Sequence, residues 1–168
     1  MIAKSHFGHY PSLRNVGGYV LMNIFVLDTD HAQNARFHVN SHIVKMPTEA
    51  AQMLSTCCRL QGIDVGFRNT HQNHPCTIWA RQSLENWLWL KEYAISLEEE
   101  WRFRYNHSSS KTHKSVDVVR ALPIPQLPEI GLTPFALCMP DHYKCECPIE
   151  SYRAFYRGDK AHLANWGN

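Results

Sequence analysis

The sequence lacks the features that would assign it at once to several large classes of protein. It contains no apolar run approaching the roughly 18 to 20 residues of a membrane-spanning helix. It also has no Walker motif, dinucleotide-binding glycine fingerprint or nucleophile elbow. Any phosphate would therefore have to be held by side chains and helix ends. No signal peptide is recognisable, so we expect a cytoplasmic protein, in a host cell, without a membrane partner.

Charge of either sign is also modest. The 168 residues carry a formal net charge of +2, with the eleven histidines counted as neutral. The protein therefore becomes clearly basic below about pH 6. Such a charge permits a nucleotide or nucleic-acid partner without requiring one. A hydrophobic fraction of 44% predicts a folded globular protein, and the length fits one domain.

The six cysteines are poorly spaced for a disulfide framework. Two are adjacent and two are separated by a single residue: Cys57, Cys58, Cys76, Cys138, Cys145 and Cys147. A disulfide between neighbours on one helix would distort the backbone. We therefore expect reduced thiols.

The apolar pattern predicts a single, mainly helical domain with one short amino-terminal β element, and an α+β fold is the alternative. Residues 1–18 are polar and aperiodic, so we expect a flexible extension there and the domain over residues 19–168. Apolar β-branched and aromatic residues at 22–28 predict the β element. Asp30 is expected to cap a short helix over residues 32–38. The strongest helical pattern extends over residues 76–105, with a candidate break at Ser83.

Proline and glycine mark the remaining helices. Asn73 or His74 is expected to cap a helix whose first turn contains Pro75. Residues 113–122 predict a short helix ended by Pro123. The last helix is expected to begin at Pro148 and to stop at Gly158.

A narrow polar stripe on the expected central helix is the main candidate site. If residues 37–56 form one helix, five polar side chains fall within an arc of about 80°: His38, His42, Lys45, Glu49 and Gln52. A stripe this narrow beside apolar residues is typical of a pocket wall. A half-exposed helix with i,i+4 pairs is an equally weighted alternative. A kink or restart at Pro47 would disrupt the stripe.

Two kinds of chemistry fit these residues, with Asp28 added because it follows the predicted β element. In a metal-free site, His38 or His42 would transfer a proton, and Asp28 or Glu49 would orient the imidazole. Lys45, with Arg81, would hold phosphate. In a metal site, His38 and His42 would bind Zn²⁺ or Fe²⁺ with His74 or Glu49 as third ligand. The cofactor stays open, with a divalent metal as one option.

Other residues are candidates for binding substrate. Arg81 lies in an otherwise apolar segment, where a charge needs a partner or a ligand, and His74 lies just upstream of it. The last helix mixes aromatic and cationic residues, among them Tyr152, Arg153 and Lys160. That mixture suits stacking on bases and holding phosphates, and is also what an ordinary amphipathic helix contains.

Several segments together carry a resemblance. They are Met22-Asn-Ile-Phe-Val-Leu-Asp-Thr-Asp, Ala35-Arg-Phe-His-Val-Asn-Ser-His-Ile-Val-Lys-Met, Asn73-His-Pro-Cys-Thr-Ile-Trp-Ala-Arg-Gln-Ser and Leu132-Thr-Pro-Phe, with Met139-Pro-Asp and the stretch from Tyr152 to Lys160. They resemble a family of small, uncharacterised proteins common in tailed-phage genomes. The resemblance implies a viral or mobile-element origin and supplies no reaction. It also implies two departures, since relatives are expected to have an acidic residue near Asn40 and no proline at position 47.

These features predict a phage-type cytosolic enzyme that acts on a nucleotide or on DNA, by base or phosphate chemistry, through a pocket of His, Lys, Asp and Arg side chains. The alternative is a non-catalytic module that binds nucleic acid or a host protein. An enzyme needs the polar stripe to converge in a concave site, whereas a binder would spread its cations over an open surface. The oligomeric state is left open.

Overall fold

The computed structural model describes residues 22–166, and within them the chain is a single, mainly helical domain. The predicted fold class is thereby confirmed. The expected extension at 1–18 and the expected start of the domain at 19 lie outside the described residues. The elements are α1 His31–Phe37, α2 Asn40–Arg59, α3 Pro75–Ala80, α4 Leu84–Arg104, α5 Lys114–Ala121, the 3-10 helix η1 Asp141–Tyr143, α6 Pro148–Arg157 and the 3-10 helix η2 Ala161–Leu163.

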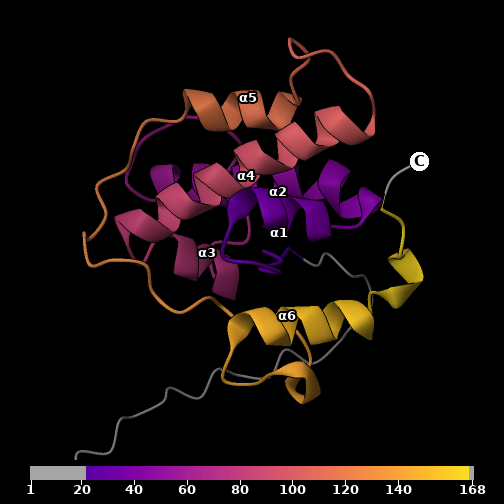
Figure 1. Ribbon diagram of the computed structural model, residues 1–168. Coiled ribbons are helices and arrows are strands. Elements are labelled where there is room, and N and C mark those ends of the chain that lie inside the picture. The colour runs from indigo at the N-terminus through magenta and orange to yellow at the C-terminus, as the bar shows by residue number, and fades with distance from the viewer. Residues whose placement is uncertain (1–21, 167–168) are drawn as a thin grey trace, which may run out of the picture.

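Helices α2 and α4 form the centre of the fold. Helix α2 packs against α3, α4 and α5, and α1 packs against α4. Their facing side chains, such as Ile43, Leu54, Trp87 and Leu97, are fully buried. Figure 1 shows α5 on one side of this group and α6 on the other. No helix among the described residues is long and apolar enough to cross a membrane.

The segment 22–28 has no regular secondary structure and pairs with no strand among the described residues, and its residues 22–27 are buried. The expected β element is therefore not formed as a strand. Side chains satisfy its backbone instead: Asn34 Oδ1 accepts the Leu27 amide at 2.8 Å, and Arg153 Nε donates to the Leu27 carbonyl at 2.8 Å. The Phe25 ring contacts His42 of α2 and Tyr152 of α6. The segment thus joins α6 to the helical core.

The expected central helix begins later than the pattern indicated. Helix α1 ends at Phe37, His38 and Val39 have extended backbone, and α2 begins at Asn40. His38 therefore does not share a helix with the other polar residues of the stripe, which corrects the angular argument for that residue. Helix α2 continues through Pro47 to Arg59, so the proline costs one helical hydrogen bond without ending the helix. His42, Lys45, Glu49 and Gln52 consequently stay on one helix.

The proline and glycine signals hold elsewhere. His74 caps α3 with Pro75 in the first turn, and the Ser83 side chain caps α4, so the long helical pattern is indeed broken there. Helix α6 begins at Pro148 and is capped by Gly158. These predicted boundaries are confirmed. They matter for the site because they place His74 and Cys76 at the start of α3.

Candidate active site

Glu49 of α2 is a buried carboxylate with few partners. Its relative exposure is 7%, Oε2 accepts the backbone amide of Asn23 at 2.8 Å, and Oε1 lies 3.2 Å from Lys45 Nζ. Burial raises the pKa of Glu49 above 4.5, against the opposing effects of the Asn23 amide, Lys45 and Lys160. A carboxyl group with a raised pKa can donate and accept a proton closer to neutral pH.

Two lysines flank this carboxyl group. Lys45 is one helical turn before Glu49, and its side chain is well exposed. Lys160, which follows α6, is half-buried. Burial, and then the positive charge of Lys45, lower the pKa of Lys160, whereas Asp159 and Glu49 oppose the change. A lysine whose pKa is lowered offers a neutral amine more readily, which is the form that acts as a nucleophile.

His42 lies beside this group and is neutral. Its Nδ1 is 2.5 Å from the Tyr156 hydroxyl, and its ring stacks on Phe25 with 4.4 Å between centroids. Burial, followed by the charges of His38, Lys160 and Lys45, lowers the pKa of His42 to about 3. The ring therefore carries no charge at ordinary pH, and it supports the wall of the site.

His38 lies behind His42 and is fully buried. Its Nδ1 contacts the Asn34 carbonyl at 2.7 Å, and its Nε2 contacts the Tyr93 hydroxyl at 2.9 Å. Burial lowers the pKa of His38 to about 4. Both ring nitrogens are thus engaged within the protein, so we assign His38 a structural role in place of the predicted catalytic or metal-binding one.

Asp28, Arg153 and Tyr152 are not brought to Glu49. Arg153 Nη2 is 3.2 Å from Asp28 Oδ2. Asp28 lies five residues after Asn23, at the other end of the segment 22–28. Tyr152 is fully buried and its hydroxyl lies 3.1 Å from Asn23 Oδ1. We therefore regard Asp28 and Arg153 as an anchor for α6, and Tyr152 as a support for Asn23.

Arg81 and His74 lie around α3. Arg81 Nη1 donates to the Gln72 carbonyl in the preceding loop, so its charge has a partner within the protein. His74 groups with Cys76 and Cys138, and one ligand atom from each lies within 4.8 Å of the others. The predicted metal set of His38, His42 and His74 is not assembled in this arrangement.

Asn23, Cys76 and Cys138 are the residues that sequence reasoning missed. Asn23 joins the two groups, because its amide binds Glu49, its Nδ2 donates to the Cys138 carbonyl at 2.8 Å and its Oδ1 is 3.7 Å from Cys76 Sγ. A hydrogen bond between the two thiols, together with burial, raises the pKa of Cys76 well above 9.0, and the same bond lowers that of Cys138. The sequence signal available was His74-Pro-Cys76 at a helix start.

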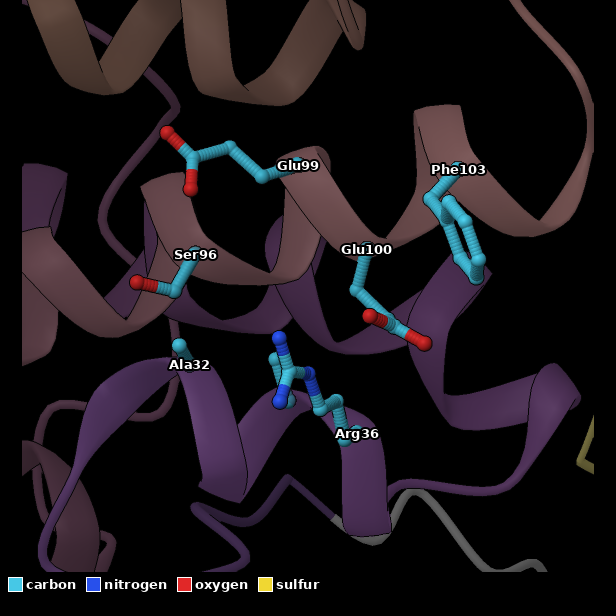
Figure 2. A pocket seen from close by; sticks show the side chains of 7 residues that line it. Ala32, Arg36, Ser96, Glu99, Glu100 and Phe103 are labelled. Carbon is cyan, nitrogen blue, oxygen red and sulfur yellow. The ribbon is translucent and has the colours of Figure 1, made fainter.

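A cleft of about 390 Å³ lies elsewhere, between α1 and α4 (Figure 2). Figure 2 shows Arg36 pointing from α1 toward α4, which contributes Glu99, Glu100 and Phe103. None of the predicted site residues lines this cleft. Its charged groups are Arg36 and two glutamates, of which Glu100 is already paired with Arg104 at 2.7 Å, so we place the candidate active site at Glu49 and not in this cleft.

Comparison with known proteins supplies the functional class. Residues 22–113, more than half of the chain, match the family model described as pyrimidine dimer DNA glycosylase. The chain belongs to this family. The predicted action on DNA is thereby confirmed at the level of the family. No curated protein and no solved structure gives a match.

The matched range contains most of the candidate active site. It starts at Met22, directly before Asn23, and includes Lys45 and Glu49. Lys160 and Cys138 lie beyond its end. The family match therefore includes the Glu49 carboxyl group and the Asn23 backbone amide that binds it, whereas the half-buried Lys160 lies in the C-terminal part of the chain.

Proposed function

We propose that the protein breaks the N-glycosidic bond of a damaged pyrimidine in DNA, with Glu49 as the acid–base residue. The observation that supports this most is the buried Glu49 carboxyl group, whose pKa is raised while Lys45 and the Asn23 amide hold it in place. It lies within the range that matches the pyrimidine dimer DNA glycosylase family.

The chemistry explains why such a group is useful. As a glycosidic bond breaks, positive charge develops on the sugar and negative charge on the leaving group. A protonated Glu49 can give its proton to the departing base, and the carboxylate that remains stabilises the cationic sugar. One residue can therefore serve both sides of the reaction, provided that its pKa lies close to the working pH.

Lys160 is the candidate nucleophile. In this step the lone pair of its neutral amine forms a bond to C1′ of the deoxyribose as the bond from C1′ to the base breaks. The bonding electrons leave with the base, which takes the proton from Glu49. The Glu49 carboxylate takes one proton from the resulting ammonium and passes it to O4′ as the C1′–O4′ bond breaks, so the sugar ring opens to a protonated imine. Water then adds to C1′ and hydrolyses the imine, which leaves an aldehyde at C1′ and returns Lys160 as the amine. The lowered pKa of Lys160 supports its role, because only the neutral amine can attack.

DNA would have to present the damaged nucleotide outside the base stack. Enzymes that act on a base extrude it from the duplex, and damage lowers the energy needed to unpair it. Lys45 and Arg157 are exposed beside the site and at the end of α6, where they can contact phosphates. We therefore expect binding that weakens as the salt concentration rises.

A duplex oligonucleotide containing one thymine photodimer tests this proposal. The wild-type protein should create an alkali-labile site at the dimer and leave the undamaged duplex intact. Borohydride, which reduces an imine, should trap a covalent complex, and peptide mapping should place the DNA on Lys160. The variant Lys160→Arg should lose trapping, while Lys144→Arg, which changes an exposed lysine before α6, should keep it.

Three outcomes would contradict parts of the proposal in different ways. Binding to the dimer duplex without any alkali-labile site would favour the non-catalytic DNA-binding alternative. Alkali-labile sites without borohydride trapping would show that water, and not an amine, attacks the sugar. Trapping on another residue would retain the glycosylase function and remove Lys160 from it.

A further inference from the structure

We propose that His74, Cys76 and Cys138 bind a thiophilic divalent cation, with zinc as the natural occupant. One ligand atom from each residue lies within 4.8 Å of the other two. The residues come from the start of α3 and from the segment that precedes α6. They are separate from the acid–base chemistry assigned to Glu49, so the proposal does not depend on the proposed function.

The distances suit a cation better than a disulfide. Zinc bonds of about 2.3 Å to sulfur and about 2.0–2.1 Å to nitrogen, in a tetrahedral arrangement, place ligand atoms roughly 3.5 to 3.8 Å apart. Cys76 Sγ and Cys138 Sγ are 3.2 Å apart, so the sulfurs need to separate only slightly. A disulfide of about 2.05 Å would instead require them to approach by more than 1 Å.

The ligand types also select the ion. Two thiolates and an imidazole are soft to borderline donors, which favour zinc over magnesium or calcium. Cys76 is fully buried and Cys138 is half-buried, so a charged thiolate pair there would need a cation to compensate it. His74 Nδ1 accepts the Cys76 amide at 3.1 Å, and binding would exchange that hydrogen bond for a metal–nitrogen bond.

A cation in this position would stabilise the entry to the C-terminal part of the chain. It would link the first turn of α3 to Cys138, whose carbonyl accepts Asn23 Nδ2. The backbone amide of Asn23 in turn donates a hydrogen bond to Glu49 Oε2. The fourth coordination position is left to water or to Oδ1 of the Asn23 side chain, which is 3.7 Å from Cys76 Sγ. Three protein ligands and one open position are a common zinc arrangement.

The direct test measures metal in the full-length protein without DNA. Protein purified without chelator should contain one equivalent of zinc by mass spectrometry. After chelator treatment, Co²⁺ should restore one equivalent and give the near-ultraviolet thiolate-to-cobalt absorption band. Cys138→Ser and His74→Asn should each weaken cobalt binding by at least about ten- to a hundredfold. Asparagine is chosen because it can still cap α3 and so separates the cap from the ligand.

The chain offers a matched control in the exposed pair Cys145 and Cys147. The double change Cys145→Ser with Cys147→Ser should leave cobalt affinity and the thiolate band unchanged. The proposal is overturned if reduced wild-type protein gives no thiolate band, or if Cys138→Ser binds cobalt with wild-type affinity and gives a band of undiminished intensity. Isolation of the protein with Cys76 and Cys138 joined in a disulfide, and with no metal bound after reduction, would overturn it as well.

Failure of this proposal is distinguishable from failure of the proposed glycosylase function. A protein that cleaves the glycosidic bond in dimer DNA but gives no cobalt band retains the activity and loses the metal site. A protein that binds one cobalt but does not act on dimer DNA shows the reverse. Since Cys76 is fully buried, the more accessible Cys138 and His74 carry the mutational test.

Discussion

Two buried glutamates in this protein have opposite surroundings. Glu98 of α4 is fully buried, and Glu49 of α2 has a relative exposure of 7%. Glu98 accepts hydrogen bonds from Arg102 Nη1 at 2.8 Å, from the His113 amide at 2.8 Å and from both terminal nitrogens of Arg120. Among residues 22–166, Glu49 is bonded only to the Asn23 backbone amide and to one exposed lysine.

The difference appears in their proton affinities. Burial acts to raise the pKa of Glu98, but the hydrogen bonds of Arg120, the His113 amide and Arg102 outweigh it and hold the pKa below 4.5. At Glu49 burial prevails, and the pKa lies above 4.5. Glu98 is therefore committed to tying α4 to α5, whereas Glu49 retains the capacity to exchange a proton. Burial alone does not identify a catalytic acid. The number of hydrogen-bond and ion-pair partners decides whether the pKa of a buried carboxyl group is raised or lowered.

The largest expected effect on stability comes from Glu98. The change Glu98→Ala leaves two arginines without their common partner, and breaking a buried ion pair costs on the order of 3 to 5 kcal/mol. The lower end applies because the Arg120 side chain is 39% exposed. Urea denaturation at pH 7 measures the loss. The control Glu99→Ala, at an exposed neighbour, should change stability by about 0.5 kcal/mol or less. Equal effects of the two would remove the structural role of Glu98.

A smaller effect on stability is expected from the pH dependence of the buried His38. His38 has a pKa of about 4 in the folded protein against 6.5 as a free side chain. The unfolded chain therefore binds more protons between these values, so stability is complete above pH 6.5 and falls as the pH drops toward 4. The loss is on the order of 3 kcal/mol. His38→Gln should make this slope shallower in denaturation curves by the part that one imidazole contributes, the remainder coming from His42 with its pKa of about 3. The exposed His142→Gln should leave the slope unchanged. An unchanged slope in His38→Gln would contradict the neutral, buried imidazole.

The smallest expected effect on stability comes from Glu49. Its raised pKa means that its contribution is largest below pH 4.5 and is lost as the pH rises through the folded pKa, the opposite sign to Glu98. Glutamine at position 49 can still accept a hydrogen bond from the Asn23 backbone amide. Glu49→Gln should therefore change stability at pH 7 by less than about 1 kcal/mol, and a gain is the expected sign. Melting temperatures at pH 5 and pH 8 check this. A loss as large as that of Glu98→Ala would make Glu49 structural.

Much of the fold could be predicted because its signals are local. Caps and breaks at His74, Ser83 and Gly158 depend on a few neighbouring residues. The same reasoning failed at the junction of α1 and α2, where the spacing of apolar residues predicts one continuous helix. In the structure the His38 ring contacts the Asn34 carbonyl, and the backbone at His38 is extended. The β element failed for a related reason, since side chains and not a second strand satisfy its backbone.

The candidate site was predicted only where its residues share a helix. Lys45 and Glu49 are four residues apart on α2, and helical geometry brings them together. Asn23 and Cys138 are separated by 115 residues, and no local pattern indicates that they meet. Asp28 was assigned to the site from its position after the predicted β element, and Arg81 from its charge in an apolar segment, but each has a partner elsewhere. Contacts between residues this far apart in the sequence could be found only from the structure.

The most direct test of the central claim compares Glu49→Gln with Glu150→Gln, which changes an exposed glutamate on α6. Both proteins should fold and bind a duplex that contains one thymine photodimer. In single-turnover measurements of glycosidic-bond cleavage at pH 7, followed as alkali-labile sites, Glu49→Gln should be slower than wild type by about a hundred- to ten-thousandfold, the usual contribution of a positioned acid or base. Glu150→Gln should match the wild type. Wild-type rates in a folded, DNA-binding Glu49→Gln would contradict the claim that this carboxyl group is kept for chemistry.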